Sequence, residues 1–432
     1  MLLLGISTAW AQYSGPALLT RGEAPAAISI PDIRFRPFVQ VAGVYDTGLA
    51  GVTVANESGQ LAETASAGVQ LVFGISGSHA WRHTKVGLGY QGNISHYAQR
   101  SYYDGFNQSL SLSVNHEFTR HATFNLSESA GMFSRNFGLT GLQSTVAFDP
   151  ATANIPVTDF FDNRTIYSTT QAAFILQKTS RLSFRLGGDS ALIFRRSSAL
   201  YSTHLYEARG DIQYRLTKRT TVGPFYSYAK MGYSRVFGGT DAHTFAGSYS
   251  IRINRTVEFS AYAGVVRYES SFLQTTAIDP AIAALLGVTQ NVQLYYALRS
   301  SPTVDARISK ALRRGVLFAN GGRTLMPGNG LFLTTEMTTI GGGYAYNGLR
   351  RWSASVQGMY ARGDAFGNVS GVYGNMSAGL SLARSLGHAM HLAISYQARK
   401  YDSPNYANYN RVIHQASVSL AFSPGETPLR LW

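Results

Sequence analysis

The sequence has no cysteine and little charge, and each shortage limits what the protein can be. Without cysteine there are no disulfides, thiolate metal sites or cysteine nucleophiles. Charged residues make up 14 % of the 432 residues, whereas an average soluble protein carries about 25 %. Mean hydropathy is only −0.06, and no apolar run reaches the roughly 18 residues of an α-helical membrane span. This composition fits a surface that is apolar on one side and polar on the other.

Sequence motifs of common enzymes are missing as well. There is no nucleophile elbow, no zinc-protease motif and no phosphate loop, so a membrane-embedded hydrolase is a remote alternative. No metal site and no cofactor is predicted. The formal net charge of +14 would suit a nucleic acid, but the basic residues form no stripe. Nucleic-acid binding is therefore not predicted.

What the chain does have is an alternation of apolar and polar residues with period two, almost unbroken from Phe35 onward. Leu110 and Leu112 alternate with serines, and Phe184 and Leu186 alternate with Arg185 and a glycine. Such strands have one apolar face along their whole length. That face could pack on a second sheet in a sandwich or contact lipid in a membrane barrel.

The connections between these strands favour the barrel. Short basic turns alternate with longer loops, as they do in an up-and-down barrel. The predicted turns lie at Gly77–Ala80, Arg120–His121, Thr179–Arg181, Lys218–Arg219, Asn254–Arg255, Lys310–Arg314, Gly348–Arg351 and Ser385–His388. We predict an all-β, transmembrane, up-and-down antiparallel β-barrel of about 18 strands, with 16 as the nearest alternative.

The expected organisation has four parts. Ala9-Trp10-Ala11 resembles a signal-peptidase site after a short apolar run, so residues 1–11 are interpreted as a signal-peptide remnant. Residues 12–34 are rich in Pro, Ala and Gly and are expected to form a periplasmic linker. The barrel should span residues 35–422. Two prolines follow, so residues 423–432 are expected to be a C-terminal tail.

Charged residues within the strands are the candidate functional residues. Charge facing lipid at the bilayer midplane costs about 2–4 kcal/mol, so these side chains should face inward. They could form a charged constriction that selects solutes, or ion-paired ladders that brace the wall, or both. The candidate lumen-lining residues are Arg185, Asp189, Glu207, Arg209, Asp211, Arg215, Arg252, Glu258, Arg299, Asp305, Arg307 and Arg362.

Residues at the barrel ends have two interpretations each. The basic turns could dock an acidic partner, although contact with anionic lipid headgroups is the simpler explanation. The many tyrosines near strand ends could stack on sugar rings, but an aromatic girdle is the default. Asp279–Gly287 has the capping pattern of a short helix, which could cap the rim or narrow the lumen. Loop 135–164 is a second candidate for folding inward.

The segment Val39-Gln40-Val41-Ala42-Gly43-Val44-Tyr45-Asp46-Thr47-Gly48-Leu49 resembles the opening strand of bacterial outer-membrane β-barrel porins, including barrels associated with exopolysaccharide export. The resemblance implies the barrel class and no particular substrate. Many such barrels also end on an aromatic residue that the barrel-assembly machinery reads, and here Phe422 and Trp432 are the candidates.

We therefore expect a protein of the bacterial outer membrane that forms a porin-like channel for small solutes. Its expected partners are outer-membrane lipid, the assembly machinery and small solutes or saccharides. The alternative is a structural or binding component of an envelope polysaccharide or secretion system. The sequence leaves the oligomeric state open.

Overall fold

A computed structural model describes residues 34–48, 65–98, 104–133, 165–196, 200–277, 290–328, 333–349, 351–366, 371–386, 389–402, 411–423 and 427–428. No helix in these ranges is long and apolar enough to cross a membrane. The signal-peptide remnant, nearly all of the linker, loop 135–164 and the predicted loop helix 279–287 lie outside the described residues.

All the regular structure is antiparallel β-sheet. The strands of the first half are β1 Arg34–Asp46, β2 Ser66–Ala80, β3 Thr84–Tyr97, β4 Gly105–Thr119, β5 Ala122–Phe133, β6 Thr165–Gln177, β7 Leu182–Arg195, β8 Thr203–Arg215 and β9 Thr220–Tyr233. The second half contains β10 Gly238–Arg252, β11 Val257–Ala277, β12 Gln290–Leu312, β13 Gly315–Pro327, β14 Thr334–Leu349, β15 Trp352–Phe366, β16 Gly371–Ser385, β17 Met390–Asp402, β18 Arg411–Phe422 and the two-residue β19 Thr427–Pro428.

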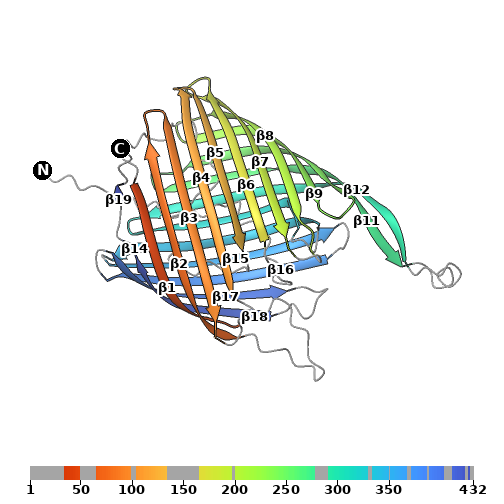
Figure 1. The fold of residues 1–432 in the computed structure, drawn as a ribbon. Helices are drawn as coiled ribbons and strands as arrows, with labels where there is room; N and C mark the ends of the chain where they lie inside the picture. Colours follow the sequence, from red (N-terminus) through yellow and green to blue (C-terminus); the bar gives the residue numbers. More distant parts are fainter. Residues whose placement is uncertain are drawn as a thin grey trace.

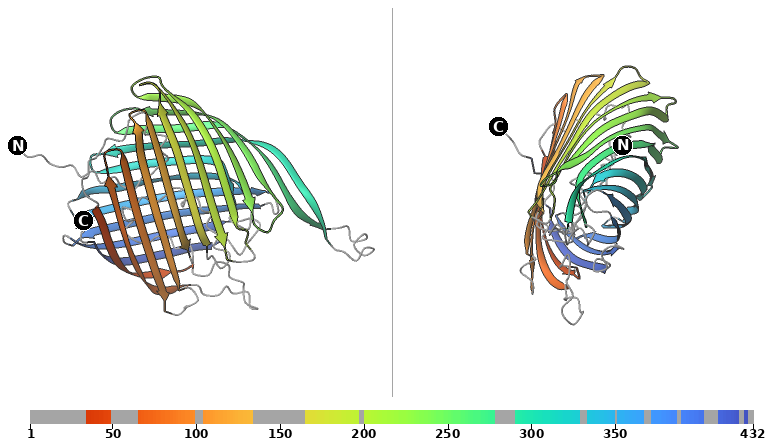
Figure 2. Two further views of the ribbon diagram at one scale, coloured as in Figure 1. Left: turned by 45° about the horizontal axis from the view of Figure 1, so that its top comes forward. Right: turned by 90° about the vertical axis from the view of Figure 1, so that its right-hand side faces the viewer.

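The strands close into a barrel. Each strand from β1 to β18 pairs with its neighbours in the sequence, and β18 pairs with β1, for example Val41 with Leu420. Figure 1 and the two views of Figure 2 show this closed wall. The predicted fold and the count of about 18 strands are confirmed. β19 adds a short pairing of Thr427 with Phe35, so part of the predicted tail joins the sheet.

The short turns gather at one end of the barrel, here called the turn end, and the longer connections at the other, the loop end (Figure 1). Seven of the eight predicted turns overlap a strand junction of the turn end. The turn predicted at Gly77–Ala80 is wrong: β2 runs to Ala80 and the chain turns at residues 81–83. Gly77 has the small size of a turn residue, but it pairs with Phe35 on one side and Leu88 on the other.

Alternate residues divide between the two faces as the period predicts. In β1, Val39, Val41 and Tyr45 are about half exposed, whereas Gln40 and Ala42 are buried. Following the cross-strand register from these residues defines an inward and an outward face for every strand. Polar residues dominate the inward face, and the outward face carries exposed aliphatic and aromatic side chains, as the solvent inside and the lipid outside demand.

Candidate functional site

The inward face of β7 and β8 carries the densest group of predicted charges. Arg185 lies directly opposite Asp211, and Asp189 lies directly opposite Glu207. Between these two pairs, Arg209 lies opposite Gly187. This group, Arg185, Asp189, Glu207, Arg209 and Asp211, is called the charged ladder below. It combines two cations and three carboxylates on two neighbouring strands.

Gly187 shapes the charged ladder because it leaves room for the Arg209 side chain. A Cβ atom added at Gly187 would lie 2.9 Å from Nε of Arg209. The guanidinium of Arg209 on β8 thereby reaches diagonally to Asp189 on β7. Nη1 of Arg209 lies 3.4 Å from Oδ2 of Asp189. Both side chains are largely buried in the wall. One arginine is thus positioned beside the two facing carboxylates of Asp189 and Glu207.

A second charged region lies on β12, also on the inward face. Arg307 is opposite Ser260 and Asn320, and Asp305 is opposite Tyr262 and Gly322. A Cβ atom added at Gly322 would lie 2.9 Å from Oδ2 of Asp305. As at Gly187, a glycine provides the space that a charged side chain occupies.

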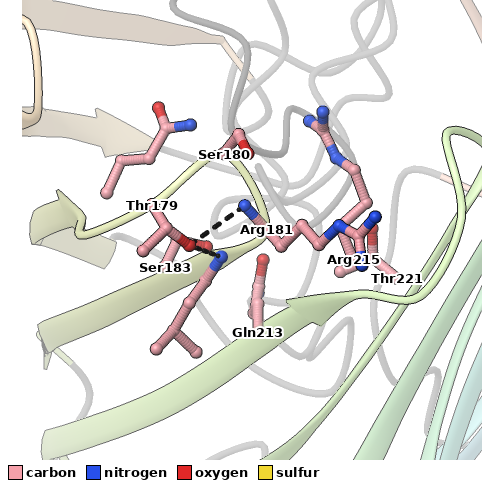
Figure 3. Close-up of a pocket in the computed structure, with 9 residues that line it drawn as sticks. Thr179, Ser180, Arg181, Ser183, Gln213, Arg215 and Thr221 are labelled. Carbon is pink, nitrogen blue, oxygen red and sulfur yellow. Dashed lines mark hydrogen bonds between the residues drawn. The ribbon is translucent and has the colours of Figure 1, made fainter.

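Other predicted residues lie near the barrel ends. Arg252 and Glu258 face each other beside the turn end, with Nε 2.7 Å from Oε1 and both side chains partly exposed. Arg215 lines a small hollow at the same end with Arg181, Gln213 and neighbouring residues (Figure 3). The hollow lies under the β6–β7 turn, where the Thr179 hydroxyl accepts hydrogen bonds from the backbone N–H groups of residues 181 and 182. Near the loop end, Arg299 of β12 lies opposite Tyr268 of β11 and, like it, is on the inward face.

Arg362 departs from the expectation that it faces inward. It pairs with Thr338 and lies on the same face as Ile340 and Tyr360, which are exposed on the outside of the barrel. It forms an ion pair with Asp364 at 3.4 Å. The alternation predicted the opposite face, because at this end of β15 the polar residues Arg362 and Asp364 have the outward register, whereas Ala361, Gly363 and Ala365 have the inward one.

Arg195 is an inward cation that was not among the candidates. Arg195 is buried at the loop end of β7, where Nη1 donates to the backbone carbonyl of Tyr201 at 2.7 Å and contacts Oγ1 of Thr203 at 3.3 Å. Arg195 is an even number of residues from Arg185 and Asp189 on the same strand. This spacing in the sequence already assigns it to the inward face. Its contacts close the β7–β8 connection, so its role there is structural.

The wall on the opposite side of the lumen is polar but mostly uncharged. Ser395 and Ser417 share a hydrogen bond of 2.7 Å, and so do Ser355 and Ser381. Buried amides on the inward face continue this surface: Gln40, Gln70, Asn93, Asn107 and Gln415. The lumen is therefore asymmetric, with most of the predicted charge concentrated on β7, β8 and β12 and neutral hydroxyl and amide groups prominent on the opposite strands.

The barrel wall overlaps itself at the loop end between β12 and β13. The two strands pair only from Leu312–Gly315 to Val304–Arg323, although β12 continues back to Gln290. Pro302 has no N–H to donate and lies just past the last pair, which suits the end of a ladder. Beyond this point the β11–β12 hairpin projects away from the other strands (Figures 1 and 2).

The loop-end portions of β13, β14 and β15 lie inside this hairpin. Phe366 stacks on Tyr268 of the inward face of β11, with ring centroids 5.1 Å apart. Oε1 and Oε2 of Glu336 accept hydrogen bonds from Tyr268 and Ser301 at 2.8 and 3.0 Å, and Arg323 forms an ion pair with the same carboxylate. The outward face of this part of the wall thus packs on the inward face of β11 and β12, so that two layers of the wall lie side by side at the loop end.

Within the residues that the structure describes, no group of three or more His, Asp or Glu side chains is placed to hold a metal ion. Across the lumen, the charged wall of β7 and β8 faces a wall of mostly neutral polar side chains. Such a surface can orient and partially desolvate small polar solutes, because fixed charges next to a low-dielectric wall focus the electric field.

No protein-family model matches the chain. No curated protein matches it either. Among solved structures, the chain is similar to the outer membrane protein OpdK from Pseudomonas aeruginosa, with 10 % identity, a TM-score of 0.43, and coverage of 91 % of this chain and 98 % of that one. OccAB3 from Acinetobacter baumannii gives 8 % identity, a TM-score of 0.41, and coverage of 91 % and 100 %.

Proposed function

We propose that this protein is a porin-like channel of the bacterial outer membrane that lets small polar solutes cross passively. The observation that carries the proposal is the sorting of side chains in a closed wall of 18 strands. Outward positions such as Val41, Leu186 and Ile394 are apolar and exposed, while polar residues are concentrated on the inward face. A barrel of this strand number encloses more space than its own side chains can fill.

The charged ladder and Arg307 are proposed as the part of the lumen that distinguishes solutes by charge. Arg185 and Arg209 face carboxylates on the neighbouring strand, so much of their field is cancelled locally. Among the candidate residues with the inward register, six arginines outnumber five acids. We therefore infer a modest preference for anions, stronger at low salt, because the Debye length grows from about 10 Å at 0.1 M to about 30 Å at 0.01 M.

Single-channel recording in planar bilayers tests the proposal, together with swelling of proteoliposomes in neutral sugars of increasing size. We expect discrete conductance steps and a size cut-off. The full chain is used, and its folded state is checked by the heat-dependent mobility of the barrel in detergent gels. A folded barrel without conductance or sugar permeability would refute the channel.

The wall overlap favours a second function. Because the loop-end parts of β13 to β15 occupy the lumen behind β11, the barrel could act as a closed scaffold or binding component of an envelope polysaccharide or secretion system. Absence of permeability would support this second function. Binding of saccharide fragments to the closed barrel, measured by calorimetry, would then be its positive test.

A further inference from the structure

Glu128 is a carboxylate on the outward face of the barrel. It lies on β5 in phase with Phe124, Leu126 and Met132, and its direct neighbours are Leu112 on β4 and Thr170 on β6. The adjacent residue Ser129 is buried and faces inward, so the opposite direction of Glu128 is fixed by the strand. The alternation that places leucines on the lipid side therefore also places this acid there.

The position of Glu128 is within the lipid-facing zone and not at its edge. On β6 the outward face is apolar at Leu176 and Phe174 toward the turn end and at Ile166 toward the loop end. These positions enclose about the 9–11 residues that a tilted strand needs to cross a membrane. Thr170, directly opposite Glu128, lies between them. Ionisable residues at such depth are costly and are functional-site candidates by default.

Hydroxyl groups surround the carboxylate on the same outward face. The Ser168 hydroxyl donates to Oε1 of Glu128 at 2.7 Å, and the Thr170 hydroxyl donates to Oε2. A carboxylate can accept about four hydrogen bonds, so acceptor capacity remains. Ser190 lies opposite Thr170 on β7, and its hydroxyl has no hydrogen bond to any described part of the chain. One patch thus holds both an acceptor and a donor that lipid tails cannot satisfy.

The patch is also low in profile, which permits close approach of another wall. Ala130, Ala172 and Gly188 adjoin the polar row on the outward face, and a Cβ atom added at Gly188 would meet only a backbone oxygen at 3.5 Å. Interfaces inside membranes typically combine small residues with hydrogen bonds across the contact. Here the donors and acceptors occur on the same patch, so the patch is complementary to itself.

We propose that this outward patch of β5, β6 and β7, centred on Glu128, is the surface through which a second copy of this chain binds in the membrane. In a twofold contact the same patch serves both subunits, and self-complementary hydrogen bonding is what such symmetry requires. The partner's wall replaces lipid over the carboxylate, and hydroxyl groups of one subunit donate to Glu128 of the other. The lumen of each barrel stays independent of this contact.

Four variants of the full-length protein test the proposal by molar mass in detergent, measured by light scattering or sedimentation. Glu128→Leu removes the acceptor, and Gly188→Leu adds bulk to the patch. Gly358→Leu is the matched control, because Gly358 also faces outward with free space, but on β15 across the barrel (Figure 1). Glu128→Gln keeps a hydrogen-bonding side chain. We expect dimers for the wild type, Glu128→Gln and Gly358→Leu, and at least tenfold weaker association for the two disruptive variants.

Cross-linking in native outer membranes provides the second measurement. The chain has no cysteine, so single cysteines at Ala172 and, as control, at Ala354 can be treated with a short bismaleimide. We expect a dimer band from Ala172→Cys only. A monomeric wild type without cross-links, a cross-link to a different protein, or a Glu128→Leu barrel that loses stability but keeps its dimer mass would each overturn the proposal.

Discussion

Arg209 of the charged ladder should matter more to stability than its neighbouring acid Asp189. Arg209 contacts Asp189 at 3.4 Å, with exposed side-chain fractions of 21 % and 14 %. Asp189 also lies directly opposite Glu207, and like charges in that position repel. Arg209→Ala therefore leaves two facing carboxylates without their cation. Asp189→Asn leaves Arg209 beside Glu207, which can replace the lost partner.

The expected magnitudes follow from this asymmetry. Removing one partner of a buried ion pair costs about 3–5 kcal/mol, and we expect Arg209→Ala to lie near the lower end because the lumen is hydrated. Asp189→Asn should cost about 1 kcal/mol, because only one ion-pair contact is lost and Glu207 remains beside Arg209. The variant that carries both Arg209→Ala and Asp189→Asn should lose less unfolding free energy than the sum of the two single losses. We expect the difference to be about 1 kcal/mol or more.

Guanidinium unfolding in liposomes, followed by tryptophan fluorescence, measures these free energies. Repeating the series in about 1 M salt, where the Debye length is about 3 Å, should reduce the difference between the two single variants. Equal losses for Arg209→Ala and Asp189→Asn, or additive effects in the double variant, would refute the assignment of Arg209 as the shared cation.

Four further outcomes are expected. Phe237→Cys should react with an impermeant thiol reagent on intact cells, whereas Lys218→Cys, on a turn at the opposite end, should react only after lysis; labelling of both would contradict the topology. Leu186→Arg, on the exposed outward face, should reduce the unfolding free energy by about 2–4 kcal/mol near the midplane, and unchanged unfolding would contradict the facing of β7. Arg307→Glu should shift the reversal potential in a salt gradient toward cations, and an unchanged potential would exclude this arginine from the selective region. Phe366→Ala removes the ring that stacks on Tyr268 and should increase conductance; an identical conductance would show that the overlap does not restrict the passage.

Much of this protein is encoded locally. The period of two assigns Leu186 to lipid and Arg185 to the lumen, because successive side chains of any strand point to opposite faces. The alternation of short turns and long loops defines the up-and-down order, since tight turns can only join neighbouring antiparallel strands. The same period already places Glu128 in phase with Phe124 and Leu126, so this outward acid could be identified without coordinates.

The tertiary structure decided which residues meet. Arg209 has acids two positions away on either side in its own strand, Glu207 and Asp211, yet its ion pair is with Asp189. That partner depends on the register between β7 and β8, and on the space left by Gly187. A sequence period gives the face of a side chain but not the offset between two strands, because that offset depends on turn geometry and on closure of the whole sheet.

The same reason explains the overlap between β12 and β13. Locally, residues 290–303 form an ordinary alternating strand, and Pro302 is the only indication that pairing ends there. β13 could pair with the whole of β12 or leave it and pack on its inner side. Which of these occurs depends on contacts such as the stacking of Phe366 on Tyr268, two residues that are about a hundred positions apart in the chain. For this reason Glu336, which has the outward register of its strand, lies where two layers of the same wall meet. Local alternation determined the barrel and its two surfaces, whereas long-range packing determined the shape of its interior.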